Sequence, residues 1–126
     1  MTKTTGKDNV ITVHVVAYRK APGLHIQAAV TPELLDLTSL PEGEMVIQWK
    51  LDTKGYHFPD DGRAIVFTSP GAEKSFGRVE LDRTRSVATV RGQNSDGLAY
   101  AYNVTVVEEA TGLSTVLDPI VQNKGR

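Results

Sequence analysis

The segment EMVIQWKL, residues 44–51, alternates between one fully apolar and one mostly polar set of side chains. Four large apolar side chains fall on one face of an extended chain: Met45, Ile47, Trp49 and Leu51. Successive side chains of a strand point to opposite faces, so this pattern predicts a strand with one buried face. One buried and one wet face are typical of an antiparallel sheet that covers a core.

The rest of the chain repeats this pattern at short intervals. Val, Ile and Thr make up 33 of the 126 residues, and these β-branched side chains suit a pleated sheet. Clusters of Gly, Pro, Asp and Asn interrupt the apolar runs, so we expect an all-β fold, an antiparallel two-sheet sandwich of about seven or eight strands. The predicted strands cover residues 9–18, 25–30, 44–51, 63–68, 76–81, 86–91, 98–108 and 114–122.

Two segments depart from the simple strand pattern. Thr31, Pro32 and Glu33 begin the segment 31–40 with a helix start signal, so we expect one or two helical turns there. Pro119 cannot donate a hydrogen bond to a sheet. We therefore expect the last strand to bend at Pro119 or to lie at a sheet edge.

Length and composition limit the class of protein. The length suits one domain, which we expect to span residues 1–126 with loose ends at 1–8 and 123–126. The chain has no cysteine, which excludes disulfides and cysteine nucleophiles. It shows neither a secretory signal nor a membrane-spanning segment, so we expect a soluble cytoplasmic protein without membrane contact. A net charge of −1, with the charges scattered, argues against nucleic-acid binding.

The segment SDGLAYAY, residues 95–102, adds a second pattern downstream of Trp49. Asp96 is followed by Tyr100 four residues later and by Tyr102 two residues beyond that. This spacing resembles the D-x-G-x-Y-x-C pattern of the immunoglobulin family. In that family the tyrosine closes a corner, and a tryptophan packs on the disulfide between the sheets.

The resemblance implies an immunoglobulin-like or fibronectin-like sandwich without a disulfide. Tyr102 stands where the second cysteine of the family would be, and Ala28 or Ala29 stands where the first would be. Gly97 lies one place earlier than the glycine of the pattern. The segments FPDDG and LDPIVQN also resemble small uncharacterised bacterial β-proteins, a family that brings no activity with it. Sandwich folds host many functions, so the resemblance implies a fold and not a function.

The segment TKGYHFPDDGRAIVF, residues 53–67, brings aromatic and charged side chains together. Its candidate ligand-binding residues are Tyr56, His57, Asp60, Asp61 and Arg63. In one interpretation the rings form an exposed platform and the carboxylates accept a polar ligand. In the other, Gly, Pro and Asp form turns, and the aromatic side chains anchor a long connection in the core.

Two arrangements could hold a metal ion. The carboxylates of the 53–67 segment could bind Ca²⁺ with help from Asp52, although no D-x-D-x-D-G loop is present. His14 and His25 could face each other across a first hairpin and bind Zn²⁺ together with a carboxylate. Solvated strand histidines are the ordinary alternative. We expect neither a metal nor another cofactor.

The sequence shows no constellation of catalytic residues. A catalytic site needs a positioned base, nucleophile or acid pair. The serines lie outside any G-x-S-x-G setting, and there is neither a phosphate-binding loop nor a G-x-G-x-x-G motif. We therefore expect a protein that is not an enzyme. The alternative is a small hydrolase or lyase around His57, Asp60 and Asp61, which a cleft there would favour.

The segment ITVHVVAY, residues 11–18, is apolar on both faces of a strand. Val13 and Val15 fall on one face, and Val16 and Tyr18 fall on the other. Such a strand is either central to a sheet or meets a second subunit. A two-fold homodimer is the simplest way to cover it.

These observations predict a non-enzymatic binding or interaction module whose partner is an unknown protein or a small ligand. Its contacts would come from the loops at 56–63 and 91–97, because loops at the ends of a sandwich carry recognition. The alternative is a structural or assembly protein that acts through homo-oligomerisation.

Overall fold

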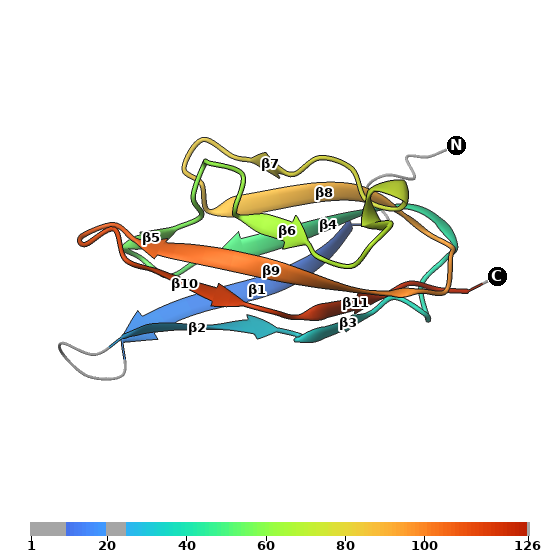
Figure 1. Cartoon of the computed structure of the whole chain (residues 1–126), viewed down its shortest axis with the longest axis horizontal. Helices are drawn as coiled ribbons and strands as arrows, with labels where there is room; N and C mark the ends of the chain where they lie inside the picture. The colour runs from blue at the N-terminus through green and yellow to red at the C-terminus, as the bar shows by residue number, and fades with distance from the viewer. Residues whose placement is uncertain (1–9, 20–24, 126) are drawn as a thin grey trace.

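The computed structural model describes residues 10–19 and 25–125, which form two stacked sheets (Figure 1). The strands of the first sheet are β1 (Val10–Arg19), β2 (Ile26–Thr31), β4 (Gly43–Leu51), β7 (Glu80–Leu81) and β8 (Val87–Asn94). Their order across the sheet is β2-β1-β4-β8-β7.

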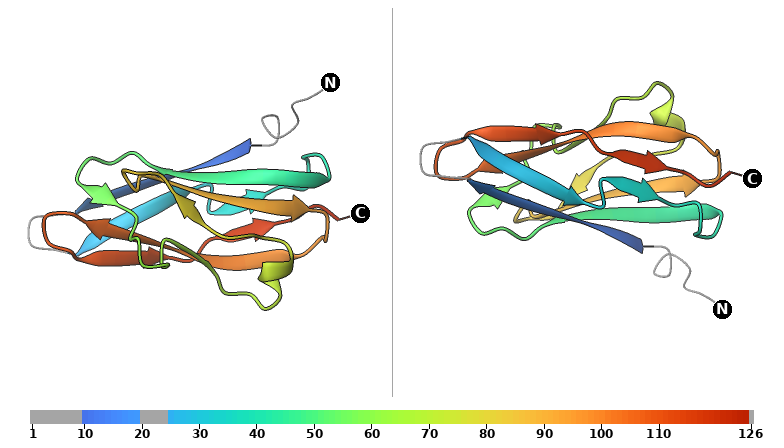
Figure 2. Two further views of the ribbon diagram at one scale, coloured as in Figure 1. Left: turned by 90° about the horizontal axis from the view of Figure 1, so that it is seen from above. Right: turned by 90° about the horizontal axis from the view of Figure 1, so that it is seen from below.

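The second sheet is built around β9 (Ala99–Glu108), which pairs on one side with β10 (Ser114–Leu117) and β11 (Ile120–Gln122). Beyond β11, β3 (Leu34–Asp36) continues the sheet. On its opposite side β9 pairs with β5 (Tyr56–His57) and β6 (Ile65–Phe67). Figure 2 shows the two sheets as separate layers.

The described residues form the predicted all-β, two-sheet sandwich, with eleven strands in place of seven or eight. The sheets are mixed and not purely antiparallel, because β1 runs parallel to β4 and β11 runs parallel to β3. Parallel neighbours need a long connection, and β2 and β3 lie in the connection between β1 and β4. Helical structure in the described part is limited to η1 (Ala72–Lys74), and no helix there is long and apolar enough to cross a membrane.

The prediction of helical turns over 31–40 is wrong. Strand β2 continues to Thr31, the Thr31–Pro32 peptide bond is cis, and β3 follows. Leu35 and Leu37 are buried, whereas the residues on either side of each are exposed. The period-two burial of the two leucines is that of a strand, and pairing with β11 outweighs the local helix start signal.

Other strand predictions change in length: the predicted strand 63–68 shortens to β6, and the predicted strand 86–91 extends as β8 to Asn94. The predicted strand 76–81 is reduced to β7, although Phe76 makes an isolated bridge to Gly92. The predicted strand 114–122 divides at Pro119 into β10 and β11, so the expected bend is confirmed. The N-terminal segment 1–8 and Arg126 lie outside the described residues, whereas Asn123 is fully buried.

Trp49 lies at the centre of the core. Its side chain is fully buried on β4, and its Nε1–H donates to the Tyr102 hydroxyl of β9 at 3.1 Å. The two rings meet edge to face, with centroids 5.4 Å apart. Tyr102 thus fills the place where the resemblance puts a cysteine. However, β4 and β9 belong to opposite sheets, whereas the immunoglobulin arrangement puts the strand with the tryptophan and strand F in one sheet.

Candidate functional site

Tyr56 and His57 form β5, at the left end of the molecule in Figure 1. The Tyr56 hydroxyl donates to Glu108 Oε2 at 3.1 Å, and His57 Nδ1 lies 3.4 Å from Glu109 Oε2. Only 15% of the His57 side chain is exposed. The two rings are therefore held against the end of β9 and do not form an exposed platform.

Glu108 is the centre of a polar network between the two sheets. Its carboxylate accepts hydrogen bonds from Arg19 Nη2 at 2.6 Å, from Arg19 Nε at 2.8 Å and from the Thr111 hydroxyl at 2.6 Å. The Arg19 bonds, supported by those from Thr111 and Tyr56, lower the pKa of Glu108 to about 2. Arg19 belongs to β1 and Glu108 to β9, so this network clamps one sheet to the other.

Asp60 and Asp61 turn to different partners. Asp60 Oδ2 lies 3.4 Å from Arg85 Nη1, in the turn between β7 and β8. Asp61 accepts from Arg63 Nε at 2.8 Å and from the Arg63 backbone N–H at 3.2 Å, and these bonds lower the pKa of Asp61. The turn interpretation of this segment accounts for both contacts. In the part of the chain that the structure describes, no three His, Asp or Glu side chains are grouped to hold a metal ion.

The proposed pairing of His14 with His25 is wrong. The antiparallel register of β1 and β2 places Thr31 opposite His14, whereas His25 precedes β2 at the other end of the pair. His14 Nδ1 instead lies 4.0 Å from Asp52 Oδ2. The prediction relied on the distance of each histidine from the turn along the sequence, which does not determine the register of β1 and β2.

The predicted recognition loop at 91–97 is wrong in part, because its residues up to Asn94 belong to β8. What remains of it and the loop at 56–63 lie at opposite ends of the sandwich (Figure 1). The Phe58 N–H donates to the Arg85 carbonyl at 2.8 Å, so the loop at 56–63 lies beside the turn between β7 and β8. The Gly97 N–H donates to the Lys124 carbonyl at 3.0 Å, so the loop before β9 lies beside the C-terminal segment. One ligand cannot contact both loops.

A polar cluster that the sequence did not predict surrounds Asp96. Its Oδ2 accepts from the Ser75 and Tyr100 hydroxyls, each at 2.5 Å, and its Oδ1 accepts from Asn123 Nδ2 at 3.2 Å. Burial alone would raise the pKa of Asp96, but these donors outweigh it and lower the pKa. Tyr100 thus closes a corner on the Asp96 carboxylate. The spacing of Asp96 and Tyr100 linked these two residues in the sequence. Ser75 and Asn123 are distant from them in sequence, so their part in the cluster could not be predicted.

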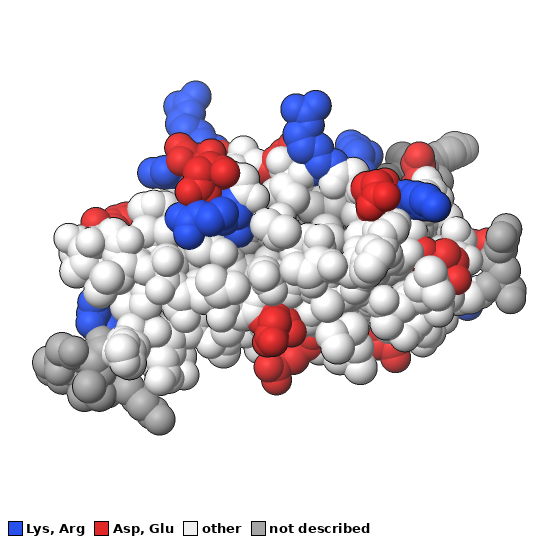
Figure 3. All heavy atoms as spheres, in the orientation of Figure 1, with Lys and Arg blue, Asp and Glu red and all other residues white. Residues whose placement is uncertain are grey.

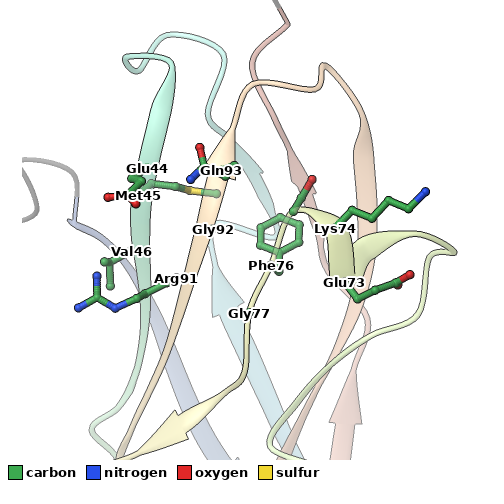
Figure 4. Close-up of a pocket in the computed structure, with 11 residues that line it drawn as sticks. Glu44, Met45, Val46, Glu73, Lys74, Phe76, Gly77, Arg91, Gly92 and Gln93 are labelled. Carbon is green, nitrogen blue, oxygen red and sulfur yellow. The ribbon is translucent and has the colours of Figure 1, made fainter.

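A hollow of about 250 Å³ lies beside β4, β8 and the segment after η1 (Figure 4). Its charged lining residues are Glu44, Glu73, Lys74 and Arg91. In Figure 4 Arg91 extends towards β4, whereas Lys74 and Glu73 extend away on the other side. The charged ends do not converge on one point, as catalytic groups must.

A larger hollow of about 520 Å³ lies beneath the loop that carries the candidate residues. Of the predicted site residues, Asp60 lines it. The lining residues are Pro59, Asp60, Gly62, Ala64, Arg78, Val79 and Leu81. This hollow adds Arg78 and two apolar side chains of the facing chain segment, which the sequence did not connect with the loop.

The outer face of the second sheet exposes large apolar side chains. Their exposed fractions lie between 39% and 55%. Figure 3 looks onto this face and shows a broad uncharged area, with charges gathered mainly towards its edges. We call it the β9 face; it consists of Leu34, Val66, Ala101, Asn103, Thr105, Val116 and Ile120. The sequence could have indicated this face, because the outward-facing residues of β9 are all uncharged.

The apolar strand β1, by contrast, lies inside the first sheet between β2 and β4. Val16 and Tyr18 are exposed at 47% and 42%, whereas Val13 is fully buried. Lys50 and Arg91 point to the same outer face as Val16. This face is therefore more polar than the β9 face.

The sequence matches no protein-family model and no curated protein.

Proposed function

We propose that this chain is a non-enzymatic interaction module that recognises a protein surface through the β9 face, and that this surface is a second copy of the chain. The observation that carries the proposal is the set of four exposed apolar side chains on the outer face of the second sheet, Leu34, Val66, Val116 and Ile120. Asp36 points to the same face at the end of β3. Contiguous exposed apolar surface of this kind marks interaction sites in soluble proteins.

The shape of the β9 face suits a flat partner. The central strand contributes the short side chains of Ala101 and Asn103, which are half-buried, and of Thr105, which is buried, while the larger apolar groups stand to either side. A ten-residue strand is about 33 Å long and neighbouring strands lie about 4.8 Å apart, so three strands offer roughly 500 Å² to a partner. Two such faces together reach about 1,000 Å², the lower limit of a specific interface.

Charge at the edges favours a second copy in one orientation. Figure 3 shows Lys and Arg along the upper edge of the face, interspersed with Asp and Glu, and acidic groups below its middle. Exposed acidic residues on the side of β3 and β10 include Glu33 and Asp118. A two-fold axis along β9 would place the upper edge of one copy against the lower edge of the other. The uncharged centres would then meet without repulsion.

The arrangement of the titratable groups supports a non-enzymatic function. His57 contacts Glu109, Asp60 contacts Arg85, and Asp61 contacts Arg63. A hydrolase or lyase would need such groups to converge on one reacting atom. That alternative predicts a loss of turnover in His57→Ala, whereas our proposal predicts no turnover to lose.

Single-cysteine cross-linking tests the placement of the interface, because the natural chain has no cysteine. Asn103→Cys lies at the middle of the β9 face, and a short bis-maleimide should join two copies there. The matched control is Gln48→Cys, at the middle of the outer face of the first sheet. Equal cross-linking of both variants, or cross-linking of Gln48→Cys alone, would contradict the placement.

The alternative of a structural or assembly protein uses the same face. The two functions differ in which partners the β9 face binds. In a recognition module, another protein can take the place of the second copy on the β9 face. An assembly protein forms only the homodimer. Cross-linking Asn103→Cys inside cells separates them, since additional cross-linked species indicate recognition of another protein.

A further inference from the structure

The hollow beneath the candidate loop lies at an open side of the sandwich. Pro59, Gly62 and Ala64 line it from the loop that leads into β6, and Arg78, Val79 and Leu81 line it from the chain segment that leads into β7. These two segments lie at edges of different sheets. The hollow therefore opens between the sheets, where a ligand can reach the side of the core.

The inner wall of the hollow is apolar. Ala64 is buried at 3% exposure, and Val79 and Leu81 are half-buried and pack against the core. A volume of about 520 Å³ falls within the range of small-molecule sites, which are lined mostly by apolar groups with few polar ones. The wall accordingly suits the apolar body of a small molecule.

The charged residues that line the hollow are Asp60 and Arg78. Asp60 is already paired with Arg85 at 3.4 Å. Arg78 is exposed and forms no hydrogen bond or ion pair with any residue that the structure describes. A guanidinium presents a planar fork of donors that matches a carboxylate. A carboxylate is therefore a suitable partner for the Arg78 side chain.

The loop that forms the hollow is fixed before any ligand binds. The Phe58 N–H bond to the Arg85 carbonyl ties it to the facing turn, and the Asp61–Arg63 contacts close its tip. Gly62 has a φ of +94°, a conformation that glycine adopts readily and other residues rarely do. A preformed site loses less free energy to ordering when it binds.

We propose that this hollow binds a small carboxylic acid with a compact aliphatic or aromatic body. The body lies on Ala64, Val79 and Leu81, and the carboxylate pairs with Arg78. The site is independent of the β9 face, so it extends the proposed function and does not rest on it.

Octanoate is the probe, followed by backbone amide shifts in NMR spectra of the full chain. We expect saturable binding at millimolar concentration, with shifts centred on Gly62, Ala64 and Val79. Octan-1-ol and octylamine carry the same chain without the negative charge, and each should bind at least about fivefold more weakly, as loss of one charge-assisted contact of about 1 kcal/mol implies.

Arg78→Gln is the decisive variant, because its exposed side chain can be replaced without disturbing the core. It should weaken octanoate binding about fivefold to tenfold and leave octan-1-ol binding unchanged. Arg83→Gln makes the same charge change in the neighbouring turn and should have no effect. Val79→Trp should fill the hollow and abolish binding of all three probes. Absence of saturable octanoate binding, or equal binding by wild type and Arg78→Gln, would overturn the proposal.

Discussion

The contact between Trp49 and Tyr102 joins the two sheets in the core of the sandwich. Both side chains are fully buried, and the indole N–H has the Tyr102 hydroxyl as its acceptor. Burial raises the pKa of Tyr102 to about 12, so the hydroxyl stays neutral at ordinary pH. Each ring thus satisfies the polar atom of the other inside the core.

Tyr102→Phe removes this acceptor and leaves the indole N–H buried without a partner. An unsatisfied buried donor costs about 1–3 kcal/mol. We therefore expect the free energy of unfolding, measured with urea, to fall by about that amount. Tyr18→Phe is the control, because Tyr18 is exposed at 42%. A Tyr102→Phe variant as stable as Tyr18→Phe would show that the hydrogen bond contributes nothing.

Gly92→Ala tests a close approach in β8. A Cβ at position 92 would lie 2.9 Å from the Ser75 carbonyl oxygen and 3.0 Å from atoms of Met45 and Phe76. Overpacking of this kind costs about 1–3 kcal/mol, and we expect that loss in urea unfolding. At Gly77 the nearest atom would be 3.5 Å away, so Gly77→Ala should cost much less. Similar losses for both variants would contradict the packing argument.

For single residues, the sequence predicted which side chains are buried better than it predicted which residues they contact. The alternation of residues 44–51 correctly places Trp49 in the core, and the spacing to Asp96 correctly singles out Tyr100 and Tyr102. It could not predict that Tyr102 meets Trp49 across two sheets, because that contact depends on strand order. His57 and Asp60 were grouped because they are close in sequence, whereas their side chains contact different turns, at Glu109 after β9 and at Arg85 before β8.

At the scale of elements, the Glu108 network joins β1, β5 and β9 at one end of the sandwich. The side chain of Glu108 is 12% exposed and that of Arg19 is 25% exposed. The ionised carboxylate therefore accepts its bonds in a largely water-excluded position. This clamp closes the end of the sandwich that lies opposite the Asp96 cluster.

The clamp predicts a specific pH dependence of stability. The folded pKa of Glu108, about 2, lies below its ordinary value of 4.5. Its stabilisation is therefore fully present above about pH 4.5 and is lost as the pH falls towards 2. Glu108→Gln should be less stable than wild type at pH 7, and this difference should shrink below pH 4.5. The measurement is urea unfolding across that range.

Glu109→Gln is the control for this comparison. Its side chain is 57% exposed, so its stability should follow that of wild type at every pH. A difference between Glu108→Gln and wild type that stays constant down to pH 2 would contradict the assignment of the clamp.

Most elements were predictable because strand periodicity is a local signal. The segment 31–40 was not, because its helix start signal competes with pairing to β11, which comes from the far end of the chain. The parallel pairing of β1 with β4 could not be predicted from the sequence either. Period-two patterns state which side chains share a face, but they do not state which strand lies next or in which direction it runs.

At the scale of the whole molecule, its two outer faces differ in polarity. The outer face of the first sheet carries Lys50 and Arg91 beside Val16 and Tyr18. The seven residues of the β9 face are uncharged, and Asp36 lies beside them at the end of β3. The sequence directed attention to β1 because apolar residues are frequent there. The β9 face is assembled from several strands far apart in the chain, so no single segment could show it.

Light scattering behind a sizing column tests self-association through the β9 face most directly. At micromolar concentration wild type should show about twice the chain mass of 13.7 kDa and should dissociate on dilution. The double variant Val116→Lys/Ile120→Lys should stay at 13.7 kDa. Val16→Lys/Tyr18→Lys, which charges similarly exposed positions on the opposite sheet, should still dimerise. A monomeric wild type, or a dimer lost only in Val16→Lys/Tyr18→Lys, would contradict the account.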